Sequence, residues 1–166
     1  MDCEFKVTLA EANALDAKAF ADIAEHSAWV SEVAFQHAPF ENRDAMIAQF
    51  SEAVMQAPRH LQLELLNAHP DLANRAKLTV DSTNEQASAG LDRLTADEFT
   101  YFTHLNTRYK LKNGFPFILA VKVATKHDIL AGFELRLLNT SEVEFQTALT
   151  EVCKIIRFRL EERVSS

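Results

Sequence analysis

One histidine of the sequence occupies a position from which it could transfer protons. His69 ends a stretch in which Leu61, Leu65 and Leu66 have helical spacing, and it directly precedes Pro70. Because proline disfavours the α-helical conformation at the preceding residue, the His69 side chain should leave the line of the helix. An imidazole titrates at about pH 6.5, so it can give and take protons near neutrality. The alternative is that the His-Pro pair only ends a helix.

A second group of polar residues follows at positions 82–86. Ser82 and Glu85 have the spacing of a capping box, in which both side chains bond to backbone N–H groups at the start of a helix. A glutamate there can also accept a hydrogen bond from an imidazole and raise the pKa of that imidazole. Gln86 adds an amide that both donates and accepts. Capping alone is a sufficient explanation of Ser82 and Glu85, so both interpretations stay open.

An arginine near the C-terminus is the third candidate. Arg159 falls on the edge of an apolar helical stripe, whose members are Phe145, Leu149, Val152, Ile156 and Leu160. A guanidinium at the margin of a core needs an anionic partner, which either the protein or a ligand can supply. A structural salt bridge and a bound anion therefore fit the pattern equally well.

Residues 115–123 form the one β-like stretch of the sequence. They lack the alternation of a half-buried strand, and no second strand follows with which they could pair. We expect an extended buried segment that passes between helices. Its backbone groups must find partners, either in the helices around it or in a polar ligand that carries carbonyl and ureido groups.

These candidates must be positioned by helices. Only three glycines and four prolines occur, too few for the many tight turns of a β-sandwich or barrel, whereas N-capping residues recur before stretches of helical periodicity. We expect an all-α, single-domain bundle over residues 1–166 with about eight to nine helices and one extended buried segment. The expected helices cover residues 8–15, a short stretch after 16, 27–37, 42 or 44 to 57, 58–69, 82–90, 95–113, 126–138 and 141–163.

Composition excludes several classes of function. The formal net charge of −7 opposes binding to a nucleic-acid backbone. No stretch approaches the roughly 18 apolar residues of a membrane span. Asp2 and Glu4 stand where a secretory signal would have basic residues, so we expect a cytoplasmic protein. The histidines and the two cysteines show no spacing typical of metal ligands, and no glycine-rich phosphate loop is present. We therefore expect neither a metal nor another cofactor.

Taken in order, the motifs resemble those of one family, the 2-oxo-4-hydroxy-4-carboxy-5-ureidoimidazoline (OHCU) decarboxylases of the urate-to-allantoin pathway. The resemblance covers nearly the whole chain. It is carried by Glu25-His-Ser-x-Trp-Val30, Pro39-Phe40, His69-Pro-Asp-Leu-Ala, Ser82-Thr-Asn-Glu-Gln-x-x-Ala-Gly-Leu91, Leu105-Asn-x-x-Tyr109, Gly114-Phe-Pro-Phe-Ile118, Arg136-Leu-x-Asn139 and Ile156-x-x-Arg-Leu160. Asn74 and Asn113 depart from the family pattern, and the loop at 74–81 is a few residues shorter than usual.

The resemblance implies a helical homodimer that decarboxylates OHCU to (S)-allantoin without metal or cofactor. By the same resemblance His69 is the general acid/base, Glu85 orients it, and Arg159 binds the anionic substrate. The other positions that the resemblance assigns to the substrate are Pro70, Ser82, Thr83, Asn84, Gln86, Phe117, Ile118, Leu119, Ala120 and Val121. Such a protein would need His69, Glu85 and Arg159 around one small anion. Two alternatives remain: the same fold acting on another ureido acid, and a non-enzymatic helical interaction module.

Overall fold

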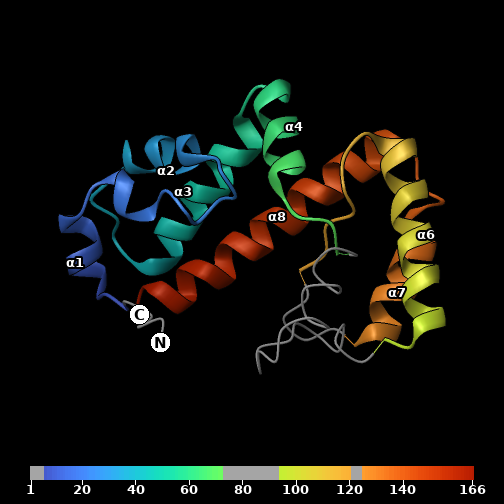
Figure 1. Ribbon diagram of the computed structural model, residues 1–166. Coiled ribbons are helices and arrows are strands. Elements are labelled where there is room, and N and C mark those ends of the chain that lie inside the picture. Colours follow the sequence, from blue (N-terminus) through green and yellow to red (C-terminus); the bar gives the residue numbers. More distant parts are fainter. Residues whose placement is uncertain (1–5, 73–93, 121–124) are drawn as a thin grey trace. The chain divides into compact units, whose positions relative to one another are not determined.

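The computed structural model describes residues 6–72, 94–120 and 125–166 (Figure 1). Within these residues the chain forms seven α-helices and one 3-10 helix, and no β-strand. The all-α prediction is confirmed. The helix expected at residues 82–90 lies outside the described residues. None of the described helices is both long and apolar enough to cross a membrane.

The chain divides into two compact units. The first comprises Met1–Ala68 and Val152–Ser166, and the second comprises His69–Glu151. The expectation of a single domain over residues 1–166 stays a prediction.

The first unit begins with two short helices whose caps the sequence predicts. In α1 (Leu9–Ala14) the Thr8 Oγ1 accepts a hydrogen bond from the Glu11 N–H at 3.2 Å, and the Glu11 carboxylate accepts from the Thr8 N–H at 2.7 Å. Asp16 caps the next element through the Lys18 N–H. That element is the 3-10 helix η1 (Ala17–Phe20) rather than a longer α-helix.

Three further helices and the end of the last helix complete the first unit. These are α2 (Ala28–Phe35), α3 (Arg43–Gln56), α4 (Arg59–Ala68) and the C-terminal part of α8 (Ser141–Arg163). The Phe35 ring packs in tilted or edge-on contacts against Phe20, Phe40 and Phe50, with ring centroids 5.4, 5.3 and 6.3 Å apart. Asn42 caps α3 through the Ala45 N–H, as expected.

Among the described residues, one isolated β-bridge joins the N-terminal and C-terminal parts of the chain in this unit. Val7 pairs in parallel with Val164: the Val7 N–H donates to the Arg163 carbonyl at 2.8 Å, and the Ser165 N–H donates to the Val7 carbonyl at 2.9 Å. The sequence did not predict this bridge, because one isolated pair of residues leaves no periodic pattern.

The second unit contains α6 (Ala96–Asn113), α7 (Lys126–Arg136) and the N-terminal part of α8. Figure 1 shows α6 and α7 beside each other, and their residues are in contact. Thr95 and Thr125 form the capping boxes of α6 and α7. Gly114 ends α6 with a φ of +80°, a left-handed conformation that favours glycine.

The start of α8 differs from the prediction. The spacing of Ser141 and Glu144 in the sequence predicts a capping box for α8. In the structure, however, Ser141 is the first residue of the helix and its hydroxyl donates to the Lys112 carbonyl. The Thr140 hydroxyl accepts instead from the Val143 N–H at 3.3 Å. Glu144 is fully buried, and its carboxylate accepts a hydrogen bond from the Tyr109 hydroxyl inside the unit.

Residues 115–120 connect α6 toward α7 and belong to neither a helix nor a strand, as expected. Their aromatic side chains are buried in a cluster of rings. Phe117 stacks on Phe133 with centroids 3.7 Å apart, and the Tyr109 ring lies edge-on to both Phe115 and Phe117. This packing makes the segment part of the core of the second unit.

Candidate functional site

His69 lies directly after the end of α4, as expected for a residue that precedes a proline. The helix ends at Ala68 and Pro70 is exposed, while the His69 side chain is nearly buried, with 7% of its surface exposed. The prediction of a helix end is therefore confirmed. The proton-transfer role of His69 stays a prediction.

Several predicted site residues lie outside the described part of the chain. These are Ser82, Thr83, Asn84, Glu85, Gln86 and Val121. The capping box at Ser82 and the orientation of His69 by Glu85 therefore stay predictions.

The substrate segment is the stretch 117–121 that the family resemblance assigns to the substrate. Two backbone groups in its described part, residues 117–120, bond to side chains. The Ile118 carbonyl accepts a hydrogen bond from Arg136 Nη1 at 2.6 Å, and the Ala120 N–H donates to Glu151 Oε2 at 2.9 Å. Side chains of the surrounding helices thus satisfy these two groups, which was one of the two alternatives that the sequence left open.

Arg136 belongs to a buried network of polar side chains. Its Nε donates to Glu144 Oε2 at 2.9 Å, and the Tyr109 hydroxyl donates to the same oxygen at 2.5 Å. Asn139 Nδ2 donates to Glu144 Oε1 at 2.9 Å. Burial, together with the hydrogen bond to Glu144, raises the pKa of Tyr109 above its ordinary value of 10. The Arg136 guanidinium carbon also lies 4.3 Å from the centre of the Phe117 ring, so the network holds the segment through both its backbone and a side chain.

Sequence reasoning assigned no site role to Glu144 or Glu151. Both are buried in α8, with 0% and 8% of their surface exposed. A usable signal was present, because Glu144, Ala148 and Glu151 are spaced four and three residues apart and therefore share one helix face. Two carboxylates on the same face as a buried alanine indicate internal partners rather than solvent.

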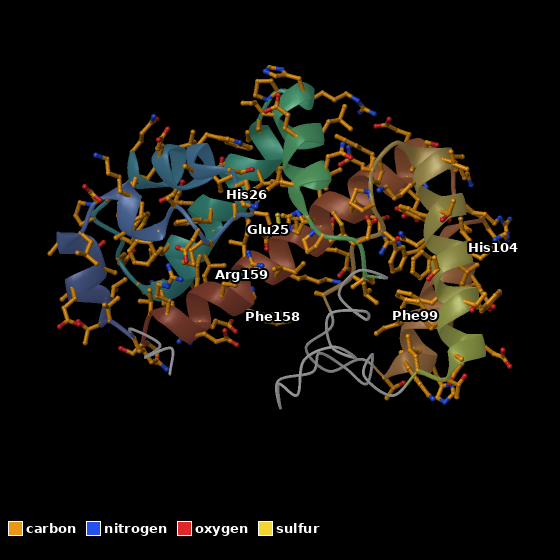
Figure 2. All side chains as sticks on the ribbon, in the orientation of Figure 1. Glu25, His26, Phe99, His104, Phe158 and Arg159 are labelled. Atoms are coloured by element: carbon orange, nitrogen blue, oxygen red, sulfur yellow. The ribbon has the colours of Figure 1, made fainter. Side chains whose placement is uncertain are left out.

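Arg159 has a protein anion as its partner. Its Nη2 lies 2.5 Å from Glu25 Oε1, and its Nη1 donates to the Ile23 carbonyl at 2.9 Å. Figure 2 shows the Arg159 and Glu25 side chains next to each other. The chain before α2 places Glu25 by a tight bend, in which His26 has a φ of +44° and the Ser27 hydroxyl donates to the Glu25 carbonyl. The structural salt bridge that the sequence allowed is therefore present.

The Arg159 side chain keeps 34% of its surface exposed in this salt bridge. The convergence of His69, Glu85 and Arg159 on one anion stays a prediction, since Glu85 is not described and the other two residues belong to different units.

The first unit also has a surface hollow of about 300 Å³ that contains none of the predicted site residues. Its lining residues are Trp29, Val33, His37, Gln49, Glu52, Ala53, Gln56, Ala57, Pro58 and Leu61. Among the residues that the structure describes, no three His, Cys, Asp or Glu side chains are arranged to hold a metal ion.

Comparison with known proteins gives a consistent result. A family model described as OHCU decarboxylase matches residues 10–161, which include parts of both units. A 2-oxo-4-hydroxy-4-carboxy-5-ureidoimidazoline decarboxylase of Haloferax volcanii is 43% identical over 165 residues, covering 97% of this chain and 98% of the relative. One of Halalkalicoccus jeotgali is 41% identical over 161 residues, covering 95% and 92%.

A solved structure agrees with this result. The crystal structure of (S)-allantoin synthase matches with a TM-score of 0.79 and 34% identity over 96% of this chain. The match covers 55% of the synthase chain, so this chain spans about half of that protein's length. The near-complete family match and the two full-length relatives lead to one conclusion: the chain belongs to the OHCU decarboxylase family.

Proposed function

We propose that this protein decarboxylates OHCU to (S)-allantoin in urate degradation and that it does so without a cofactor. The observation that carries the proposal is the match of nearly the whole chain, at 43% and 41% identity, to two relatives that bear the name of this decarboxylase. The buried His69 at the end of a helix adds a group of the right chemistry.

The residue types are sufficient for this reaction. When the substrate carboxylate leaves as CO₂, its bonding electron pair forms a double bond between C4 and C5, and the nitrogen of the ring C=N group takes up the displaced pair with a proton. The C4 hydroxyl then loses its proton and becomes a carbonyl group as C5 takes up a proton. The protein must bind the anion, exclude water and deliver a proton to one face of C5. In the proposed mechanism His69 is the general acid/base that supplies this proton, and Glu85 holds its tautomer and orientation.

Arg159 is proposed to bind the substrate anion while Glu25 holds the guanidinium in place. A guanidinium has five N–H donors, and the bonds to Glu25 and to the Ile23 carbonyl use one on each of its two terminal nitrogens. The remaining N–H donors of the guanidinium are proposed to bind the substrate carboxylate. Pro70, Ser82, Thr83, Asn84, Gln86 and the backbone of Phe117, Ile118, Leu119, Ala120 and Val121 are proposed to line the substrate.

The resemblance to the family also supports three further proposals, on oligomeric state, location and domain organisation. We expect the protein to act as a homodimer and to work in the cytoplasm. We also propose that residues 1–166 act as one functional domain, because the family model includes parts of both units.

The test uses freshly generated OHCU, with the formation of (S)-allantoin followed by circular dichroism. His69→Asn should keep the fold and lose about 10²–10⁴-fold in turnover, the usual contribution of a general acid/base. His104→Asn is the matched control, because His104 is an exposed histidine of α6 (Figure 2) and should retain full turnover. Full turnover by His69→Asn would refute the assignment. If the wild-type protein processed another ureido acid but not OHCU, the substrate assignment would be wrong.

A further inference from the structure

The two side-chain bonds to residues 115–120 share a regular feature. Arg136 holds the Ile118 carbonyl and Glu151 holds the Ala120 N–H, and these residues are two apart in the chain. In an extended backbone the N–H and C=O of one residue point to one edge, and those of the next residue point to the opposite edge. Ile118 and Ala120 therefore present one edge of the segment to Arg136 and Glu151.

The opposite edge belongs to Phe117 and Leu119. None of the described residues supplies a hydrogen-bond partner for the backbone groups of these two residues. Phe117 as a whole residue is fully buried in the ring cluster, so a ligand does not reach its backbone, whereas Leu119 is half-buried and partly exposed. Unpaired backbone groups in such surroundings require a partner, and a ureido or imide group offers N–H and C=O groups in the complementary arrangement.

We propose that Arg136 and Glu151 are positioning residues that hold one edge of this segment, so that the backbone N–H and C=O of Leu119 on the other edge bind a ureido or ring amide group of the substrate. This inference rests on the proposed function and adds to it. In the substrate segment, Ile118 and Ala120 are bonded to the protein's own side chains, and the opposite edge contacts the substrate.

The surroundings of the two side chains suit a positioning role. The Arg136 guanidinium bonds to the fully buried Glu144 and lies over the face of the Phe117 ring, so it has little freedom to change its orientation. Glu151 is itself nearly buried, and its carboxylate lies on the same face of α8 as Glu144. A rigid second layer of this kind keeps backbone groups in a productive geometry.

The test compares Glu151→Ala with Glu151→Gln, because a glutamine oxygen can still accept from the Ala120 N–H. In Glu151→Ala we expect hydrogen exchange of the Ala120 amide to accelerate by about tenfold or more, the factor that corresponds to losing a hydrogen bond to a charged group. The KM for OHCU should rise by a similar factor while kcat stays nearly constant, as expected for binding that is equal in the ground and transition states. Glu151→Gln should restore most of both values. Glu142→Ala, which alters an exposed glutamate of the same helix, should change neither.

Two results would overturn the inference. One is a folded Glu151→Ala protein whose Ala120 amide exchanges faster but whose KM is unchanged, which would make Glu151 a purely structural residue. The other is an unchanged Ala120 exchange rate.

A ligand titration separates this inference from the proposed function. If the wild-type protein did not decarboxylate OHCU, the proposed function would fail, but (S)-allantoin could still be titrated while the backbone amide resonances are followed. A larger shift at Leu119 than at Ile118 and Ala120 would support the assignment of the edges, and the reverse order would refute it.

Discussion

Two tyrosines of α6 make nearly the same hydrogen bond in different surroundings, and this pair gives a sharp test of the buried network. The Tyr109 hydroxyl donates to Glu144 at 2.5 Å and its side chain is fully buried. The Tyr101 hydroxyl donates to Glu134 at 2.6 Å, but 44% of Tyr101 is exposed. Replacing each tyrosine by phenylalanine removes only the hydroxyl, so the two variants differ mainly in burial.

The expected losses of stability differ severalfold. In Tyr109→Phe the ring contacts remain, but Glu144 loses one of its three donors while it stays buried. Arg136 Nη2 also loses the hydroxyl oxygen as an acceptor at 3.4 Å. A hydrogen bond to a charged group contributes about 1.5–3 kcal/mol when its loss leaves the charge buried. The exposed Tyr101 bond competes with water, so Tyr101→Phe should cost at most about 0.5–1 kcal/mol.

Urea denaturation and thermal melting measure the two losses. For a chain of this length 1 kcal/mol shifts the melting temperature by about 2–4 °C, so Tyr109→Phe should melt about 3–12 °C lower than the wild type. A double-mutant cycle with Glu144→Ala, which removes the acceptor, should give a coupling energy of about 1–3 kcal/mol, since the two groups are in direct contact.

The reasoning would be refuted by equal losses in Tyr109→Phe and Tyr101→Phe, or by a loss below about 0.5 kcal/mol in Tyr109→Phe. Either result would mean that the buried Glu144 does not depend on the Tyr109 hydroxyl.

Three further predictions concern local features of the fold. The hydrogen bonds from Lys126 and Thr95 lower the pKa of Glu98 to about 2 from its ordinary value of 4.5. Because the folded-state pKa is lowered, the stability that Glu98 contributes is complete above pH 4.5 and is lost as the pH falls through about 2; carboxyl NMR should find this midpoint, and Lys126→Met should raise it. Thr95→Ala should cost about 1 kcal/mol in urea unfolding, because it removes the cap of α6, and a loss near zero would contradict that role. His26→Val should cost about 1–2 kcal/mol because of the positive φ, whereas His26→Gly should be tolerated.

The ends of several described helices could be predicted from the sequence alone. Thr8, Thr95 and the Asn113-Gly114 pair set helix ends through bonds between residues three or four apart, so capping residues and apolar spacing were sufficient to locate them. The same locality explains why His69 could be placed at a helix end. Family membership also followed from short motifs in a fixed order, without any knowledge of contacts.

Only the tertiary structure showed which groups face one another. Glu144 was expected to cap α8, but it turned inward because Tyr109 and Arg136 supply donors from other helices. Arg159 could have bound a protein or a ligand anion, and the structure supplied Glu25, which is 134 positions away in the chain. Partners of buried charges are decided by packing between distant segments, and periodicity along one helix reports that a partner is required without reporting which residue provides it.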